Sequence, residues 1–230
     1  MTDHKVYPLI QGIVGSTAYG LSTPSSDIDR LGVFTYATEA FFGLEQPKES
    51  IVKTNPDSTQ HELIKAAKLL LGCNPTVTEI LWLPDYLYEF VSPLGAELIS
   101  LRYSFLSAKR VRDAYMGYAS QQFNRLLSRG DGKFDSDTGN RTAKHARHLM
   151  RLTTQGLQLY TTGSLTIPVE NPQSYHDFGN AVKASSQVAI PFMASMEEKF
   201  QNARTVLPLA PNNQPVLSLI KKVRREYYDF

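Results

Sequence analysis

The sequence contains one cysteine, Cys73, and no long uninterrupted apolar run. A single cysteine excludes an intrachain disulfide and a zinc site made of cysteines alone. The apolar stretch near the N-terminus is interrupted at Pro8, Gln11 and Gly12, before it reaches the length of a signal peptide. No segment approaches the roughly 20 apolar residues that cross a bilayer. We therefore expect a cytoplasmic protein with no membrane partner.

A strong excess of one charge is also absent. The formal net charge of the 230 residues is +2 at pH 7, which is not the polycation expected of a protein that coats nucleic acid. Contacts with nucleic acid would have to come from local clusters of basic residues. The hydrophobic content of 42% is sufficient for a substantial core, which excludes a disordered chain.

The apolar pattern changes along the chain. The first third is rich in glycine, proline, serine and β-branched residues, with apolar runs of strand length. After about Ser92, long segments have apolar residues at helical spacing. The sequence therefore predicts an α+β fold with a mixed part at residues 1–91 and a helical part at residues 92–230.

The same pattern predicts individual elements. Strands are expected at residues 9–14, 28–35 and 51–54, the last with a continuation to about residue 62. Helices are expected at residues 63–71, 77–82 (with Thr76 as N-cap), 94–104, 108–127, 141–160, 175–206 and 216–227. The polar segment 128–140 is expected to be a surface loop between two helices. The basic run at residues 221–225 is expected to be a solvated helix end.

The loop between the first two predicted strands carries the most informative residues. Gly15 and Ser16 follow the first strand, so that backbone N–H groups and the serine hydroxyl can meet a phosphate. Asp27 and Asp29 are one residue apart on the next predicted strand, which sends both carboxylates to one face and Ile28 into the core. Adjacent carboxylates suit Mg²⁺, which takes one or two of them together with water and phosphate oxygens. Each part alone also fits an ordinary turn with solvated acids, but together they predict a magnesium–triphosphate site.

These residues also match a known pattern. With Gly20 between them, Gly15-Ser16 and Asp27-x-Asp29 resemble the signature of the polymerase β nucleotidyltransferase superfamily. The longer motif resembles the RlaP-like branch of this superfamily, which contains bacterial and phage proteins, some of them associated with RNA repair. This motif reads Gly-Ser-x-Ala-Tyr-Gly-Leu-x-Thr-x-x-Ser-Asp-x-Asp-x-x-Gly-Val. The likeness extends to about Pro168. It implies a minimal nucleotidyltransferase core, a small mixed β-sheet flanked by helices, with a helical bundle after it.

The resemblance implies a metal centre with three carboxylates. Asp27 and Asp29 would hold Mg²⁺, with two ions expected and Mn²⁺ as an alternative. The superfamily supplies a third carboxylate from a later strand, which helps to deprotonate the acceptor hydroxyl. Asp57 matches the family's acid eight residues before Lys65, whereas Glu62 lies at a predicted helix start, where the helix dipole alone explains a carboxylate. Asp57 is therefore favoured over Glu62 as the third catalytic and metal-binding acid.

Basic residues could complete the nucleotide site. Lys144, His148 and Arg151 are spaced i, i+4 and i+7, so they share one face of a predicted helix. This basic stripe suits a triphosphate or an RNA backbone, and a solvated stripe that packs through its aliphatic stems fits nearly as well. The candidate nucleotide-binding residues are Gly15, Ser16, Gly20, Lys65, Lys144, His148 and Arg151.

The leading functional hypothesis is a Mg²⁺-dependent nucleotidyltransferase. It would bind an NTP such as ATP, transfer NMP to an acceptor with an RNA or tRNA end favoured, and release pyrophosphate. The alternative is a catalytically silent module on the same fold that binds nucleotide or RNA in repair or regulation. The oligomeric state has no signature in the sequence.

Overall fold

The computed structural model describes residues 4–24, 26–128 and 136–228, of which residues 136–138 are described by their backbone only. Contacts divide the chain into two compact units, Met1–Leu106 with Pro211–Phe230, and Ser107–Ala210. The first unit contains β1 (Val6–Val14), α1 (Gly15–Tyr19), β2 (Asp29–Tyr36), η1 (Thr38–Phe41), β3 (Ser50–Thr54), β4 (Asp57–Glu62), α2 (Leu63–Leu71), α3 (Pro75–Thr78), η2 (Glu79–Leu81), η3 (Asp85–Leu87), β5 (Tyr88–Val91), α4 (Pro93–Ser100), η4 (Arg102–Phe105) and α9 (Asn213–Glu226). The second contains α5 (Ala108–Ser128), α6 (Ser136–Thr162), α7 (Pro172–Ala184), η5 (Ser186–Val188) and α8 (Ala189–Asn202). The predicted α+β fold is confirmed.

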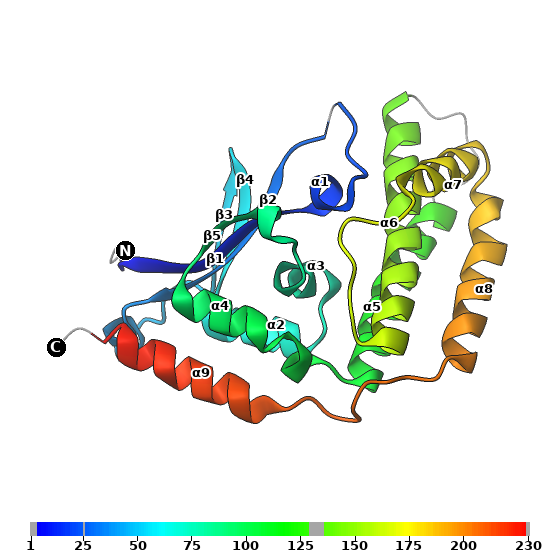
Figure 1. Ribbon diagram of the computed structural model, residues 1–230. Helices are drawn as coiled ribbons and strands as arrows, with labels where there is room; N and C mark the ends of the chain where they lie inside the picture. The colour runs from blue at the N-terminus through cyan, green and yellow to red at the C-terminus, as the bar shows by residue number, and fades with distance from the viewer. Residues whose placement is uncertain (1–3, 25, 129–135, 229–230) are drawn as a thin grey trace. The chain divides into compact units, whose positions relative to one another are not determined.

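The first unit is built on a five-stranded mixed sheet with the order β3-β4-β2-β1-β5 (Figure 1). β2 and β4 are parallel, and the other neighbouring strands are antiparallel. α2 packs against β2 and β4, and α4 packs against β1. Gly95 makes the second contact possible, because a Cβ atom there would lie 2.0 Å from the carbonyl oxygen of Leu9. The sheet and these helices share the apolar core, which includes Leu9, Phe34, Leu63 and Leu98.

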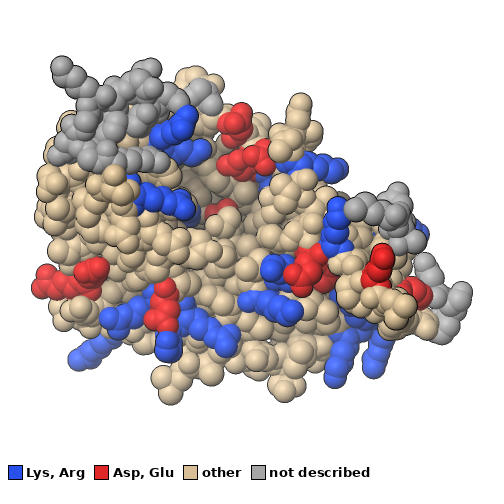
Figure 2. Space-filling model, turned by 180° about the vertical axis from the view of Figure 1, so that it is seen from behind, with Lys and Arg blue, Asp and Glu red and all other residues tan. Residues whose placement is uncertain are grey.

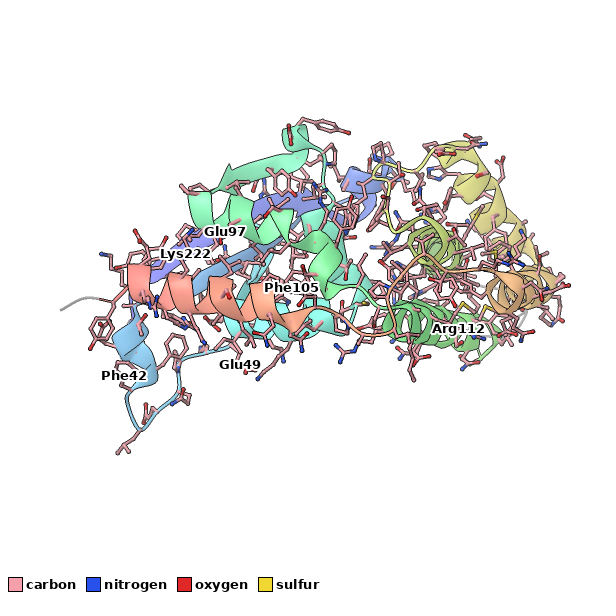
Figure 3. The ribbon with its side chains drawn as sticks, turned by 60° about the horizontal axis from the view of Figure 1, so that its bottom comes forward. Phe42, Glu49, Glu97, Phe105, Arg112 and Lys222 are labelled. Carbon is pink, nitrogen blue, oxygen red and sulfur yellow. The ribbon has the colours of Figure 1, made fainter. Side chains whose placement is uncertain are left out.

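The last helix closes the first unit. α9 lies along α4 and α2 (Figure 1). Lys222 of α9 and Glu97 of α4 form an ion pair with Nζ 2.5 Å from Oε2 (Figure 3). Just beyond the helix, the ring of Tyr227 stacks on Tyr7 of β1 with 4.3 Å between ring centroids. Contacts therefore place α9 in the same unit as the sheet, whereas the functional division at residues 91 and 92 stays a prediction.

The second unit is a helical bundle. α5 and α6 pack side by side, α7 packs on α6, and α8 contacts both α5 and α6. Gly156 allows the close approach of α5 and α6, because a Cβ atom there would lie 2.6 Å from Cβ of Tyr115. α6 begins at Ser136, before the predicted residue 141. The central part of the loop expected at residues 128–140 lies outside the described residues.

β3 confirms the strand predicted at residues 51–54, but the expected continuation to about residue 62 is wrong. The residues after the turn form a separate strand, β4, which pairs with β3 as a hairpin in which Thr54 is opposite Asp57. Pro56 lies in the turn between them, where its missing N–H group removes no ladder hydrogen bond. The hairpin places β4 beside β2 and so brings Asp57 to the start of a central strand.

Two helix predictions also need correction. The helix expected at residues 175–206 is divided into α7, η5 and α8. Pro191 explains the division, because proline is tolerated in the first turn of a helix but not in its interior. The cap of α3 is Asn74 rather than Thr76, since Oδ1 of Asn74 accepts hydrogen bonds from the N–H groups of Thr76 (3.0 Å) and Val77 (3.2 Å).

Charges of both signs are interspersed on the face shown in Figure 2, with uncharged surface between them. The sequence nevertheless distributes charge unequally between the units. Ser107–Ala210 carries 13 Lys and Arg against 8 Asp and Glu, and the rest of the chain carries 11 against 14. Positive charge is therefore concentrated in the helical unit. None of the described helices combines the length and apolar character needed to cross a membrane.

Candidate active site

Gly15 and Asp29 are in direct contact where β1 becomes α1. Gly15 has a φ of +67°, in the left-handed region that favours glycine. A Cβ atom at Gly15 would lie 2.3 Å from Oδ2 of Asp29. Because Gly15 has no side chain, the Asp29 carboxylate can pack directly against its backbone. This is the backbone segment that was predicted to bind phosphate.

Gly20 lies at the other end of α1, where the helix ends. Gly20 also has a positive φ, +70°, and ends the helix with its N–H group 3.2 Å from the carbonyl oxygen of Thr17. The next N–H group, that of Leu21, donates to the carbonyl oxygen of Ser16 at 2.8 Å. Gly20 thus has a structural role as a C-cap, and its assignment to nucleotide binding stays a prediction.

The pair Asp27 and Asp29 is not carried by one strand. β2 begins at Asp29, whereas Asp27 and Ile28 precede it, and Ile28 is 46% exposed instead of buried in the core. The reason lies in the partner strand: Asp29 pairs with Val14, the last residue of β1, so the ladder has no partner for residues 27 and 28. Asp29 is half-buried and Asp27 is exposed.

Asp57 lies on the strand next to Asp29. β2 and β4 are parallel, and Arg30 lies opposite Ser58. Asp29 and Asp57 each come one residue earlier and are the first residues of β2 and β4, so they occupy equivalent positions on the two strands. Equivalent residues of adjacent strands project to the same face of a sheet. Among the described residues, however, no three or more His, Cys, Asp or Glu side chains form a group that could hold a metal ion. Asp27, Asp29 and Asp57 are therefore not a preassembled trio.

Glu62 has a different environment. Its side chain is buried, with Oε2 accepting a hydrogen bond from the N–H group of Ile64 (2.8 Å) and Oε1 accepting one from Nη2 of Arg224 (2.6 Å). The Arg224 guanidinium also donates to Thr35 and lies 3.9 Å from the ring centroid of Phe41. Both carboxylate oxygens are thus occupied by a helix cap and a buried ion pair, which explains Glu62 without a metal.

Arg224 was missed by the sequence interpretation. The run 221–225 was expected to be solvated, but the Arg224 side chain is only 16% exposed. The available signal was helical spacing: Val216, Leu219 and Val223 form the buried face of α9, and Arg224 is adjacent to it. The prediction of a solvated helix end is therefore wrong for this residue.

Two further basic residues are in ion pairs. Nζ of Lys65 lies 3.5 Å from Oε2 of Glu49 in a partly exposed pair, which contributes little to stability. Arg30, next to Asp29, lies with Nε 2.8 Å from Oε1 of Glu89 on β5. The role of Lys65 in nucleotide binding stays a prediction.

The predicted basic stripe is on α6 in the second unit, and its members differ in burial. Lys144 is exposed, His148 is half-buried, and Arg151 is 5% exposed. Arg151 donates from Nη1 to Oε1 of Gln155 at 2.9 Å and from Nη2 to Nδ1 of His148 at 3.3 Å. A fully solvated stripe is therefore excluded for Arg151, and phosphate binding by the stripe stays a prediction.

His148 is uncharged at neutral pH. Burial, followed by the charges of Arg151, His145, Lys144 and Arg125, lowers its pKa from 6.5 to about 3. In the unfolded chain the imidazole takes up a proton near its ordinary pKa, so below about pH 6.5 the unfolded state binds more protons than the folded state. The free energy of unfolding should therefore decrease as the pH is lowered from about 6.5 towards about 3.

Urea unfolding at a series of pH values would measure this dependence. His148→Gln should reduce the slope of the unfolding free energy against pH in that window, because glutamine does not titrate. The same slope in the variant and the unchanged protein would contradict the pKa assignment.

Gly15→Ala should test the contact with Asp29. We expect it to lower the free energy of unfolding by about 1–2 kcal/mol through the left-handed backbone, and also to displace the Asp29 carboxylate. Gly163→Ala is a matched control: its φ is +73°, and a Cβ there would meet only Val206 at 3.4 Å and Leu207 at 3.8 Å. Equal loss of nucleotide binding in the two variants, measured by calorimetry, would mean that backbone strain and not the carboxylate is responsible.

A family model described as RNA repair pathway DNA polymerase beta family matches residues 2–199. None of the curated proteins matches the chain. The matched region includes Asp27, Asp29 and Asp57 and the stripe on α6, and it ends within α8, before α9 begins.

Proposed function

The chain belongs to the RNA repair pathway DNA polymerase beta family, and from this premise we propose that it is a Mg²⁺-dependent nucleotidyltransferase that transfers NMP from an NTP to an acceptor hydroxyl. The family implies a fold of the nucleotidyltransferase type. The observation that carries the proposal is the packing of Asp29 against Gly15, with Asp57 at the equivalent position of the next parallel strand. Two acidic side chains and a backbone segment without a side chain therefore lie at the ends of neighbouring strands, β1, β2 and β4.

The donor set fits Mg²⁺. Asp29 and Asp57 offer only carboxylate oxygens, Asp27 is close in sequence, and this ion requires no more than one or two protein carboxylates. When bound, Mg²⁺ would neutralise triphosphate charge and polarise the acceptor hydroxyl. We assign the three aspartates as its ligands and leave Glu62 out, because both of its oxygens are engaged within the fold.

The residues of the chain have separate tasks in this proposal. Gly15 and Ser16 bind phosphate oxygens through their N–H groups at the start of α1, where Val14 provides no side-chain cap. Asp57 accepts the proton of the acceptor hydroxyl. The acceptor oxygen then forms a bond to the α-phosphorus, the bond from that phosphorus to the bridging oxygen breaks, and pyrophosphate leaves.

A labelling experiment tests the function. Purified protein is incubated with Mg²⁺ and each α-labelled NTP, with and without total cellular RNA, and both pyrophosphate release and transfer of label are followed. Transfer to RNA would support the proposed acceptor, and transfer to protein or to a small molecule would keep the transferase but replace that acceptor. A chelator should stop the reaction, and added Mg²⁺ or Mn²⁺ should restore it. If an NTP binds and no label moves to any acceptor, the catalytically silent module is the better account.

A further inference from the structure

A chain of hydrogen bonds fixes the orientation of His148. Nε2 of Gln155 donates to the carbonyl oxygen of Thr166 at 3.2 Å, and this bond directs the amide oxygen of Gln155 to Nη1 of Arg151 at 2.9 Å. The other terminal nitrogen of Arg151 then meets Nδ1 of His148 at 3.3 Å. All four residues belong to the helical unit, so this relay is complete within Ser107–Ala210.

The relay determines the tautomer of His148. A guanidinium group has five N–H donors and no acceptor, and it is always protonated. Nδ1 of His148 must therefore be the acceptor of the bond from Arg151, and in a neutral imidazole the proton is then on Nε2. The residue one turn away behaves differently, because Nδ1 of His145 lies 2.8 Å from the amide oxygen of Gln122, which is itself an acceptor.

Two donors on this face of α6 have no acceptor among the described residues. Nε2 of His148 forms no hydrogen bond within the described part of the chain, and Lys144, four residues earlier, forms neither a hydrogen bond nor an ion pair with a described residue. Residues at i and i+4 are neighbours on a helix surface. A neutral N–H group and an ammonium group are thus directed outward from adjacent turns, in the unit that carries the excess of Lys and Arg.

We propose that Lys144 and His148 form a phosphate-binding pair, in which Nζ of Lys144 and Nε2–H of His148 donate to phosphoryl oxygens and Arg151 is a positioning residue that acts through His148. Negatively charged oxygen acceptors suit both donors, because a hydrogen bond is stronger when its donor or its acceptor is charged. The phosphate belongs either to a nucleotide or to a nucleic-acid backbone. The inference rests on the proposed function only in naming a nucleotide or a nucleic acid as the source of the phosphate.

The charges around His148 keep it a neutral donor. On α6 these are Lys144, His145 and Arg151, and on α5 the facing charge is Arg125. α7 packs against α6 at other positions, with Tyr175 bonded to Thr154 and Lys183 bonded to Asn140. The charged groups of the described residues that act on the imidazole are all basic, so the ring stays unprotonated and Arg151 keeps its acceptor.

Nitrogen NMR of the histidine side chains tests the positioning step without a mutation. In the full-length protein at neutral pH, His148 should show a pyridine-type Nδ1 and a pyrrole-type Nε2. Arg151→Met should allow a mixture of tautomers, and Arg151→Lys should restore most of the original pattern, which a purely structural role of Arg151 would not produce. A His148 that is doubly protonated, or that carries its proton on Nδ1, would overturn the inference.

Binding measurements test the donor pair. Glutamine can place an amide N–H group near the position of Nε2, and asparagine cannot reach it. We therefore expect His148→Asn and Lys144→Ala each to weaken phosphate-ligand binding by about 10- to 100-fold, while His148→Gln stays within a few-fold of the unchanged protein. Lys199→Ala, which removes an exposed lysine of α8 in the same unit, is the matched control for loss of charge.

The ligands in these titrations are a non-hydrolysable NTP analogue with Mg²⁺ and a single-stranded RNA oligonucleotide. Weakening with the analogue assigns the pair to the nucleotide, and weakening with the oligonucleotide alone assigns it to the backbone of an acceptor. If neither ligand is affected beyond the Lys199→Ala control, the pair does not bind phosphate and the inference fails. That failure is distinguishable from failure of the proposed function, because label transfer in the unchanged protein does not depend on these variants.

Discussion

Asp29→Asn should reduce nucleotidyl transfer by at least about 1000-fold, which corresponds to a loss of about 4 kcal/mol of transition-state stabilisation. The substitution preserves the size of the side chain that fits against Gly15, so the local backbone should be retained. What it removes is the negative charge that a divalent ion requires. The rate of pyrophosphate release at saturating NTP and Mg²⁺ is the appropriate measurement.

Two controls make the Asp29 result specific. Asp85→Asn removes an exposed carboxylate of η3 in the same unit and should leave the rate unchanged. Asp57→Asn should cause a loss of the same order as Asp29→Asn, since we assign both as ligands of the metal. Transfer that persists in Asp29→Asn within 10-fold of the unchanged rate would exclude the proposed metal centre.

The elements that the sequence predicted well have a clear local pattern of apolar spacing and residues that end the element. The helix at residues 63–71 was predicted to the residue, because its apolar spacing is followed by Gly72 and by Asn74-Pro75. The strand predicted at residues 51–54 is confirmed by β3, but the expected continuation to about residue 62 is a separate strand, because the run turns back after Thr54. The position of Pro56 in the middle of that run was the signal for a hairpin.

The candidate site shows a second limit of sequence patterns. The two-residue period placed Asp27 and Asp29 on one strand, yet β2 can extend only as far as β1 provides a partner, and β1 ends where Gly15 begins α1. Helical spacing correctly placed Lys144, His148 and Arg151 on one helix. Spacing does not determine which of the three is buried, because burial depends on the packing around α6.

Glu62 and Arg224 show the same limit at long range. The ion pair joins residues 162 positions apart, and no local pattern connects the start of α2 with a basic run near the C-terminus. The family model also ends at residue 199, before α9. Sequence alone could therefore not decide between Asp57 and Glu62, whereas the ion pair gives Glu62 a structural role.

Arg224→Met should lower the free energy of unfolding by about 3–5 kcal/mol, because it leaves the buried Glu62 carboxylate without its cation. The double variant Glu62→Gln/Arg224→Met should recover part of this loss, since it removes both charges. Urea unfolding of the two single variants and the double variant gives the coupling free energy of the pair.

The exposed ion pair on the same helix is the matched control. Lys222→Ala breaks the contact with Glu97 (Figure 3), whose side chains are 60% and 37% exposed, and should cost no more than about 1 kcal/mol. A cost for Arg224→Met as small as that of Lys222→Ala would show that Glu62 does not depend on Arg224. Glu62 would then be available as a metal ligand, and Glu62→Gln would be expected to abolish transfer. With the pair intact as described, Glu62→Gln should reduce stability and leave transfer near its original rate, so stability and activity together separate Glu62 from Asp57.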